Sequence, residues 1–593
     1  MPSANVDAAF VMAQFGRNQG WARQHRRFLT NVTGSQGDDL IGFGDRGVYV
    51  AESLGDGRFK NLGKVLDDFG VSQGWHSRHE ILVVDLTGNK LGDIVGFGDS
   101  HTLIAENLGN GKFRAPIKVF GDLSYAKGWR SERHIRSTAN LLESNGDNLV
   151  RCLIGVGDRS TLIAQPNSTD GIGFSAPRIH ETLSTLTRSH GWRWEYQDVS
   201  TAQHAMRFAD LTGNGLDDII AFGDRGVYVA LNHSSDSEVK IYSPFLSLEN
   251  FGTRANWHEG WNSRQIGRVE ANGPMSIFGI GNDATYVAKG RGDGTFYPVE
   301  KVLDGFSDSD GFTPGLGTCF VIDLTGDGSD DILAFNQRGT WVSFNDGHGQ
   351  FAEPTLVSDD FGGEDGWSFS DHSRFVGHLN KDKKAAADIV GCGDRGTYVI
   401  LGNETKEFAI PEVLNRTFEG SLTDITFEYI IKLPGDKIKK SPFPIPLQTE
   451  STMFLDFRTG RFQISGFSIE KILDQFKEFM PANQPPLFER VVTDPLEGQF
   501  DPSERHLDGI VSADITNINV PDFPDLDGKL KVVVSTRQTV DLGGEKFRAR
   551  AVSINEENGY FSMHGIGSVS TRIEDIPCAV RIGAKVKPSP FNS

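Results

Sequence analysis

Asp210-Leu-Thr-Gly-Asn-Gly-Leu-Asp-Asp218, followed by Ile219-Ile-Ala-Phe-Gly-Asp224, is the stretch of sequence that decides the fold. Close copies of its acidic loop occur at Asp85–Asp93 and Asp323–Asp331, each followed by a similar apolar run. Together with weaker copies between them, this sequence motif recurs about every 55 to 60 residues from the N-terminus to near residue 415. A unit of this length cannot bury its own apolar face, so neighbouring units must stack.

Seven such units align on a Gly-Trp pair and a later Gly-Phe-Gly. The pairs are Gly20-Trp21, Gly74-Trp75, Gly128-Trp129, Gly191-Trp192, Gly260-Trp261 and Gly366-Trp367, and the sixth unit has Phe312 instead. Each unit holds about four short apolar runs, rich in β-branched residues and bounded by glycine-rich turns, which is typical of strands. Seven four-stranded units predict an all-β fold, a seven-bladed β-propeller over residues 1–415, in which ring closure protects the sheet edges. A β-solenoid is the alternative, although its repeats are usually shorter.

Residues 416–593 lack the repeat and are predicted to form a separate β-rich domain of unknown fold. All nine tryptophans lie between Trp21 and Trp367, which supports the boundary near Asn415. Strands are expected at 528–535 and 547–552, with a hairpin turn at 557–559. The apolar spacing at 468–480 predicts one amphipathic helix.

A charged cluster in the C-terminal region could support chemistry. It consists of Asp501, Glu504, His506 and Asp508. Carboxylates near a histidine suit acid–base or metal chemistry, and a charged surface loop is the alternative interpretation. The chain has no Gly-x-Ser-x-Gly, His-Glu-x-x-His or P-loop motif. A carbohydrate-active enzyme of lyase or hydrolase type, with catalysis in the C-terminal domain, therefore stays as the second hypothesis.

Composition restricts the partners. The formal net charge is −20 with a sequence pI near 5.2, which argues against nucleic acid or an anionic membrane surface. No apolar run is long enough for a membrane span. We see no signal peptide, so a cytoplasmic location or release by another route is expected. The four scattered cysteines are expected to be free thiols.

The acidic loops offer oxygen donors at alternating positions, an arrangement that suits a hard cation such as Ca²⁺. Each of three loops supplies five predicted ligands: Asp85, Thr87, Asn89, Leu91 and Asp93 in the second unit, Asp210, Thr212, Asn214, Leu216 and Asp218 in the fourth, and Asp323, Thr325, Asp327, Ser329 and Asp331 in the sixth. Leu91, Leu216 and Ser329 would bind through their backbone carbonyl oxygens. Polar turns, in which Asp and Asn cap backbone amides, are the alternative. Three near-copies favour metal, because crowded carboxylates repel one another when no cation compensates them.

The combined motif is Gly-Trp, His, Arg, Asp-x-Thr-Gly-Asp/Asn, Gly-Phe-Gly-Asp-x-Gly-Val-Tyr-Val and Asn-x-Gly-Asp-Gly-x-Phe. Over about 400 residues it resembles the mushroom lectin family of Psathyrella velutina, whose propeller repeats are of the FG-GAP or VCBS calcium-loop type. The resemblance implies a fungal lectin that binds N-acetylglucosamine, and sialic acid in some members, with calcium in the acidic loops. Glycans or glycoproteins are the implied partners. The oligomeric state is left open.

The resemblance also implies the sugar-binding residues, which follow each Gly-Trp pair. They are Trp21, His25 and Arg27 in the first unit, Trp75 and His79 in the second, Trp129, His134 and Arg136 in the third, Trp192, His204 and Arg207 in the fourth, and Trp367, His372 and Arg374 in the seventh. The fifth unit has Ile266 in the His position and Arg268 in the Arg position, and the third and seventh are expected to dominate.

A sugar pocket needs an apolar surface and a few aimed polar groups, which Trp, His and Arg can supply. The Gly-Phe-Gly-Asp turn of an adjoining blade could add an acceptor. The alternative interpretation is that Trp belongs to the core between blades and that Arg donates to a backbone carbonyl. A third hypothesis for the whole chain is an adhesion propeller of integrin type, which would not need the Trp-His-Arg triplets.

Overall fold

The structure is a computed structural model of the chain. It describes residues 6–35, 37–142, 150–167, 172–194, 204–235, 238–258, 262–312, 317–379, 386–403, 405–409, 411, 417–433, 437–440, 445–446, 451–466, 490–516, 528–537, 539–542, 545–555, 560–570 and 575–588. The chain divides into two compact units, one of residues 1–8 and 14–410 and one of residues 9–13 and 411–593.

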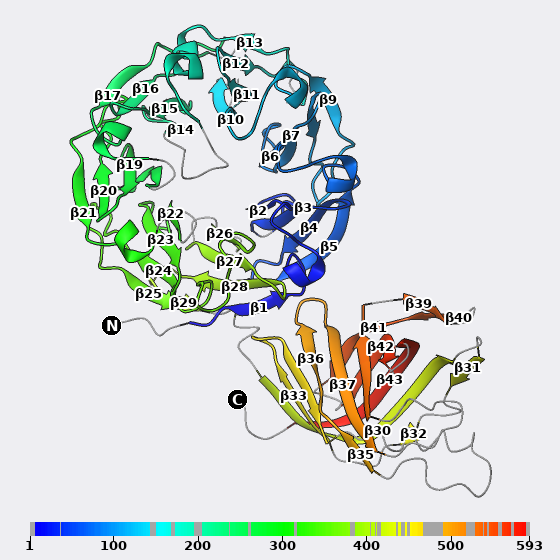
Figure 1. Cartoon of the computed structure of the whole chain (residues 1–593). Helices are drawn as coiled ribbons and strands as arrows, with labels where there is room; N and C mark the ends of the chain where they lie inside the picture. Colours follow the sequence, from blue (N-terminus) through cyan, green and yellow to red (C-terminus); the bar gives the residue numbers. More distant parts are fainter. Residues whose placement is uncertain are drawn as a thin grey trace, which may run out of the picture. The chain divides into compact units, whose positions relative to one another are not determined.

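The first unit is a ring of seven antiparallel sheets, the blades of a β-propeller (Figure 1). The first strand of each blade lies toward the centre of the ring and the last toward the rim. Inner strands contact one another between blades 4 and 5, between blades 5 and 6, and between blades 7 and 1, where the ring closes. The predicted seven-bladed, all-β propeller is therefore confirmed.

The strands of the blades follow one another in chain order. Blades 1 and 2 consist of β2 (Arg27–Thr30), β3 (Asp39–Gly44), β4 (Gly47–Ser53) and β5 (Phe59–Leu66), and of β6 (Glu80–Val84), β7 (Asp93–Phe97), β8 (Thr102–Ala105) and β9 (Ile117–Phe120). Blades 3 and 4 consist of β10 (Ile135–Leu142), β11 (Val150–Val156), β12 (Thr161–Ala164) and β13 (Arg178–Ile179), and of β14 (Ala205–Ala209), β15 (Asp218–Phe222), β16 (Val227–Ala230) and β17 (Phe245–Leu248).

The remaining blades repeat the pattern. Blades 5 and 6 consist of β18 (Arg264–Arg268), β19 (Met275–Ile280), β20 (Thr285–Ala288) and β21 (Glu300–Leu303), and of β22 (Thr318–Ile322), β23 (Asp331–Asn336), β24 (Gly339–Ser343) and β25 (Thr355–Ser358). Blade 7 consists of β26 (Ser373–Gly377), β27 (Asp388–Cys392) and β28 (Thr397–Gly402), with β29 (Phe408–Ala409) beside β28, whereas β1 (Ala9–Met12) belongs to the second unit.

Strand direction separates two sets of loops. In blade 1, Arg27 pairs with Gly42 and Thr30 pairs with Asp39. The loop that enters the inner strand therefore lies at the same end of the blade as the turn after Gly44, whereas the acidic loop lies at the opposite end. Because the same pairing recurs in blades 2 to 7, the Trp and His residues gather on one face of the ring and the acidic loops on the other.

The second unit contains a closed antiparallel barrel of eight strands (Figure 1). Around the barrel they are β30 (Thr417–Leu433), β33 (Ser451–Asp456), β34 (Arg461–Ser465), β36 (Leu496–Asp501), β37 (His506–Thr516), β38 (Gly528–Ser535), β42 (Tyr560–Ser570) and β43 (Asp575–Pro588), and β43 pairs back to β30. Shorter strands pair with strands of the barrel: β31 (Lys437–Lys440) and β32 (Ile445–Pro446) with β30, β35 (Arg490–Thr493) with β37, and β41 (Arg550–Asn555) with β42. Strands β39 (Thr539–Leu542) and β40 (Glu545–Arg548) form a separate two-stranded sheet.

The predicted β-rich C-terminal domain is confirmed, including the strand at 528–535. The single strand expected at 547–552 is divided between β40 and β41. Strands β41 and β42 pair across the predicted hairpin, whereas its turn and the helix expected at 468–480 lie outside the described residues. Across the described ranges no helix is long and apolar enough to cross a membrane. All four cysteines are free thiols.

The acidic cluster of the second unit is an ion-pair network. Arg537 contacts the carboxylates of Asp501, at 2.7 Å, and Glu504, and its Nε lies 3.6 Å from Asp508. Asp501 is buried. The guanidinium compensates these carboxylates, and because Asp501 is buried at the end of β36 the cluster differs from the charged surface loop that was the alternative interpretation.

Candidate functional site

In blades 1 to 5 the tryptophan of the entry loop follows a short 3₁₀ turn, and in blade 6 Phe312 takes this place. The turns are η1 (Arg17–Gln19), η2 (Val71–Gln73), η3 (Tyr125–Lys127), η4 (Thr182–Leu186) followed by η5 (Arg188–His190), η6 (Thr253–Ala255) and η7 (Asp308–Asp310). The turn rests on the preceding blade: Ser72 N–H donates to the Asp45 carbonyl and Arg254 N–H to the Asp224 carbonyl. The residues that follow it therefore lie where two blades meet.

The tryptophan rings are part of the core between blades. Trp21, Trp75, Trp129, Trp192 and Trp367 are only 7–8% exposed. The first glycine of Gly-Phe-Gly makes room for the indole, because a Cβ on Gly42 would lie 2.5 Å from Trp21 Cη2. This geometry differs from the expectation that the indole face meets the sugar, and it explains why the sequence repeats Trp and Gly together.

The histidines orient an aspartate. In the five units that have His, a backbone N–H donates to Nδ1, so Nδ1 carries no proton and the neutral ring has its proton on Nε2. The donors are Ala22, His76, Arg130, Arg193 and Ser368, at 2.9–3.2 Å. Nε2 then faces the aspartate of the Gly-x-Gly-Asp turn at 2.8–3.1 Å, in the pairs His25–Asp45, His79–Asp99, His134–Asp158, His204–Asp224 and His372–Asp394.

These aspartates are the exposed acceptors of the site. Their side chains are 46–65% exposed, whereas the histidines behind them are 2–5% exposed. Burial lowers the pKa of His79, His134 and His204, which keeps them neutral near pH 7. The predicted site residues did not include these aspartates, and the aspartate belongs to the same unit as its histidine rather than to an adjoining blade.

A coordinated replacement in blade 5 supports the pairing of the two positions. There Asn262 stands for His and Asn282 for Asp, and Asn262 Nδ2 donates to Asn282 Oδ1 at 2.7 Å. His258 N–H donates to Asn262 Oδ1 as the other backbone amides donate to the histidines. This joint change is the sequence signal by which the aspartate could have been found.

The fifth and fourth units need a correction of register. The structural counterpart of Trp21 in blade 5 is Trp257, which follows Asn256 in the left-handed conformation that Gly20 adopts in blade 1. The sequence alignment had used Trp261, which lies outside the described residues, and Arg268. Asn256 can take the place of the expected glycine because Asn tolerates positive φ.

The strand pairing fixes the Arg position as well. Arg27, Arg136, Arg264 and Arg374 all pair with the first glycine of the Gly-x-Gly motif. In blade 4 the residue in this register is Met206, paired with Ala221, and Arg207 lies one position further on. Arg207 therefore points to the other face of the strand from the arginines it was aligned with.

The in-register arginines donate to backbone carbonyls; Arg27, Arg136 and Arg264 are buried and Arg374 is half-buried. Arg27 Nη1 donates to the Phe15 carbonyl at 2.7 Å, and Arg374 Nε donates to the Phe361 carbonyl at 2.8 Å. Burial lowers the pKa of Arg136 and Arg374 to about 10, at which they remain protonated at pH 7. Their geometry matches the structural interpretation of the arginine. A role of the Trp, His and Arg residues in binding stays a prediction.

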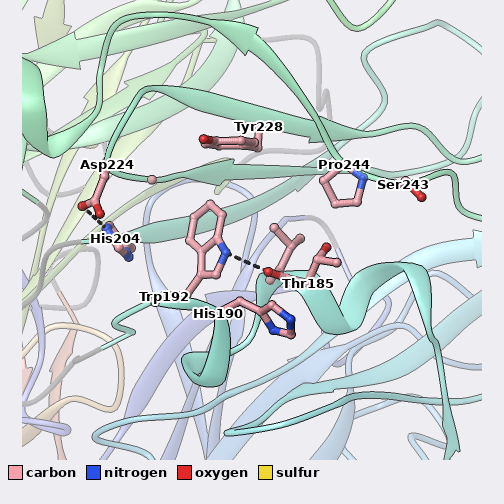
Figure 2. A pocket seen from close by; sticks show the side chains of 11 residues that line it. Thr185, His190, Trp192, His204, Asp224, Tyr228, Ser243 and Pro244 are labelled. Carbon is pink, nitrogen blue, oxygen red and sulfur yellow. Dashed lines mark hydrogen bonds and ion pairs between the residues drawn. The ribbon is translucent and has the colours of Figure 1, made fainter.

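A pocket of about 290 Å³ opens beside the His–Asp pair of blade 4 (Figure 2). Trp192 and Tyr228 form its aromatic wall, with ring centroids 5.5 Å apart and nearly perpendicular planes. Trp192 Nε1 donates to the Thr185 carbonyl, so the indole is fixed. The remaining lining residues are Thr185, Leu186, His190, Gly191, His204, Gly223, Asp224, Ser243 and Pro244. The pocket thus combines an apolar wall with one oriented carboxylate.

The acidic loops on the opposite face close on their own amides. Asp85, Asp210 and Asp323 accept N–H groups three and five residues further on, at 2.7–2.8 Å. The middle residue of each loop accepts the amide two residues further on: Asn89 from Leu91, Asn214 from Leu216 and Asp327 from Ser329. These are the capped turns that were the alternative to metal binding.

The last aspartate of each loop joins the loop to the β-sheet. Asp93 accepts the amides of Leu86 and Asn107, and Asp218 and Asp331 accept the corresponding amides of their blades. All three are buried. Burial raises the pKa to about 6 for Asp93 and Asp218 and to about 7 for Asp331.

Whether these loops fit Ca²⁺ depends on oxygens that remain available. Among the residues that the structure describes, no three His, Cys, Asp or Glu residues lie together as a metal site. One oxygen does favour a cation: Thr212 Oγ1, a predicted ligand in blade 4, is buried and has no hydrogen-bond partner among the described residues. The donor chemistry suits Ca²⁺, and the amides already occupy the carboxylates, so calcium binding by Asp85, Thr87 and the other predicted ligands stays a prediction.

Comparisons with known proteins agree with the propeller. A solved structure of an Agrocybe aegerita lectin, described as recognising non-reducing terminal N-acetylglucosamine, is 31% identical with a TM-score of 0.56, and the match covers 62% of this chain and 94% of the lectin. A Photorhabdus luminescens Tc toxin matches with 14% identity and a TM-score of 0.33, over 86% of this chain and 22% of the toxin. A BBS1N–ARL6DN complex matches with 10% identity and a TM-score of 0.34, over 68% of this chain and 99% of the matched chain. Both similarities are too low to support an argument.

No protein-family model and no curated protein matches the chain. The identity to the lectin and its nearly complete coverage are nevertheless sufficient to assign a family. This chain belongs to the family of the Agrocybe aegerita lectin.

Proposed function

We propose that the propeller is a multivalent lectin for N-acetylated sugars, N-acetylglucosamine first, and that it binds them at the His–Asp pairs on one face of the ring. The observation that carries this proposal is the repeated exposed carboxylate, which lies 2.8–3.1 Å from Nε2 of a buried histidine in five of the seven blades. The specificity of the Agrocybe aegerita lectin supports the choice of sugar.

The oriented carboxylate is suited to sugar hydroxyls. Asp224 Oδ1 accepts His204 Nε2 and Thr253 Oγ1, at 3.0 and 2.6 Å. Oδ2 has no hydrogen-bond partner among the described residues, and the side chain is 56% exposed. A hydroxyl that donates to a carboxylate forms a charge-assisted hydrogen bond, which is shorter and stronger than a neutral one. Because the histidine fixes the carboxylate beforehand, little ordering is lost on binding.

The pocket of blade 4 fits one sugar unit. Its volume of about 290 Å³ lies just below the range for small-molecule sites, roughly 300–1,000 Å³, as expected for a pocket that holds one sugar unit. Tyr228 and Pro244 offer apolar surface to the acetyl methyl group, while Asp224 accepts hydroxyl groups. For sialic acid, the cations beside two other aspartates are relevant: Arg17 lies 3.5 Å from Asp394, and Arg133 lies 2.7 Å from Asp158.

Several weak sites on one rigid ring would gain avidity for multivalent glycans without any new contact. We also propose that Ca²⁺ binds the acidic loops of blades 2, 4 and 6, on the opposite face from the sugar. There it would stabilise the fold and touch no sugar. The enzyme hypothesis gains no support from the acidic cluster, because Arg537 compensates Asp501 and Glu504.

The test is a titration of the full chain with N-acetylglucosamine and glucose, on the wild type and on Asp45→Asn/Asp224→Asn. The substitution replaces one carboxylate acceptor with an amide donor at each site, and blade 5 shows that Asn fits beside the turn. Losing a hydrogen bond to a charged group costs about 1.5–3 kcal/mol, so each altered site should weaken by roughly ten-fold or more. Asp56→Asn is the matched control, because Asp56 lies in the turn after β4 on the other face of the ring and pairs with Arg58. Unchanged binding by the double variant, or equal affinity for glucose, would overturn the proposal.

A further inference from the structure

One of the five His–Asp pairs is already occupied by the protein itself. In blade 2, Arg78 Nε donates to Asp99 Oδ1 at 3.1 Å and Arg78 Nη2 donates to Asp99 Oδ2 at 3.0 Å. His79 also reaches Oδ1, at 2.8 Å. Both carboxylate oxygens are therefore engaged, so a sugar hydroxyl that donates to Asp99 would have to compete with the guanidinium.

The other four pairs leave one oxygen open. In Asp158 and Asp394, the histidine and the nearest arginine share Oδ1. Asp224 uses Oδ1 for both His204 and Thr253. Asp45 pairs with His25 through Oδ1 and is the most exposed of the five. Within the described ranges, no protein group is seen on Oδ2 of any of these four aspartates.

Contacts of its guanidinium and of its backbone carbonyl hold Arg78 in this position. The guanidinium carbon of Arg78 lies 5.2 Å from the centroid of the Tyr125 ring. The guanidinium carbon of Arg130 also packs on this ring, 3.6 Å from the same centroid. The Arg78 carbonyl accepts Ser131 Oγ at 3.2 Å and Arg136 Nη2 at 3.4 Å. The backbone and the ring thus fix the fork on the carboxylate, a bidentate geometry that Lys or Gln cannot reproduce.

The residue before the histidine differs between blades. Blade 1 has Gln24 before His25, where blade 2 has Arg78 before His79. Gln24 is exposed. Blade 3 also has an arginine here, Arg133 before His134, but Arg133 reaches only Asp158 Oδ1, at 2.7 Å. The bidentate contact of Arg78 with both oxygens of Asp99, and not an arginine at this position alone, therefore separates the closed pair from the open ones.

We propose that Arg78 acts as a built-in occupant of the blade 2 site and keeps it closed to sugar, so that the ring has fewer open sites than His–Asp pairs. This inference rests on the proposed function, because it assumes that sugar binds the open pairs. It identifies Arg78 as a specificity-determining residue that acts by competing for Asp99.

The test is a reciprocal exchange followed by crystallography of the full chain soaked in N-acetylglucosamine. Wild-type crystals should show sugar at open pairs, such as those of Asp45 and Asp224, and none at Asp99. Arg78→Gln should add one sugar, at Asp99, and Gln24→Arg should remove the one at Asp45. Arg225→Ala is the matched control, because Arg225 is an exposed neighbour of Asp224 that pairs with Glu249, and it should change no site.

The possible failures are distinguishable. Sugar at Asp99 in the wild type would overturn the inference, as would filled open sites in Arg78→Gln with Asp99 still empty. Sugar at none of the pairs, in any variant, would overturn the proposed function and this inference with it. If Arg78→Gln does not fold, Gln24→Arg decides alone: retention of sugar at Asp45 contradicts the competition, and its loss supports it.

Discussion

Replacing Arg374 should destabilise blade 7 without removing a sugar contact. Its guanidinium donates to the carbonyls of Phe361 at 2.8 Å, of Ser368 at 3.3 Å and of Trp367 and His372 at 3.2 Å. Four carbonyls of the entry loop would lose this donor in Arg374→Ala. Hydrogen bonds to charged groups contribute about 1.5–3 kcal/mol when well formed, and three of these four are long. We therefore expect a total loss of about 3–5 kcal/mol.

The assay is chemical denaturation of wild type, Arg374→Ala and Arg374→Lys, with N-acetylglucosamine titration of each variant under folding conditions. Lys keeps the charge but not the fork, so its stability should fall between the other two. Per-site affinity should change little at Asp45 and Asp224, which lie in other blades. An Arg374→Ala variant as stable as wild type that had lost most of its avidity would refute this reasoning. It would restore the role that the sequence predicted for Arg374.

If Ca²⁺ binds the acidic loops, the melting temperature should rise with the logarithm of its concentration, and a chelator that changes nothing would count against metal binding. Without added metal, the free energy of unfolding should fall by on the order of 1 kcal/mol between pH 6.5 and 8. Burial raises the pKa of Asp331 and Asp388 to about 7, and the stability that their protonated forms contribute is lost as pH rises through that value; a flat profile from denaturant titrations would contradict this. Gly96→Ala should cost about 1–3 kcal/mol, because its Cβ would lie 2.2 Å from Trp75 Cη2, and an unchanged denaturation midpoint would show that the indole can move.

The repeat was sufficient to predict the propeller. Strand length, turn residues and the recurrence of Gly-Trp and Gly-Phe-Gly are local features, and each is visible without knowing what the unit packs against. The fifth unit was misaligned because Asn256 replaces the glycine at a positive-φ position, while Gly260-Trp261 offered a closer match of letters. Strand register corrected it.

Less of the candidate site than of the fold could be predicted from the sequence. Burial separates its members: Trp21 and Arg27 are in the interior, while Asp45 is exposed, and none of this follows from spacing. The role of the histidine depends on a backbone amide that fixes its tautomer, which the sequence does not encode directly. The barrel closes through β30 and β43, whose strands are separated by about 150 residues, and such long-range pairing leaves no local signal.

The central claim is that sugar binds through the aspartates of the His–Asp pairs, and one measurement tests it most directly. The full chain with Asp45, Asp99, Asp158, Asp224 and Asp394 all changed to Asn should be compared with the wild type on an array of N-acetylglucosamine-terminated glycans. A folded variant with the wild-type circular dichroism spectrum and no array binding is the predicted result. A folded variant that binds as the wild type does would contradict the account.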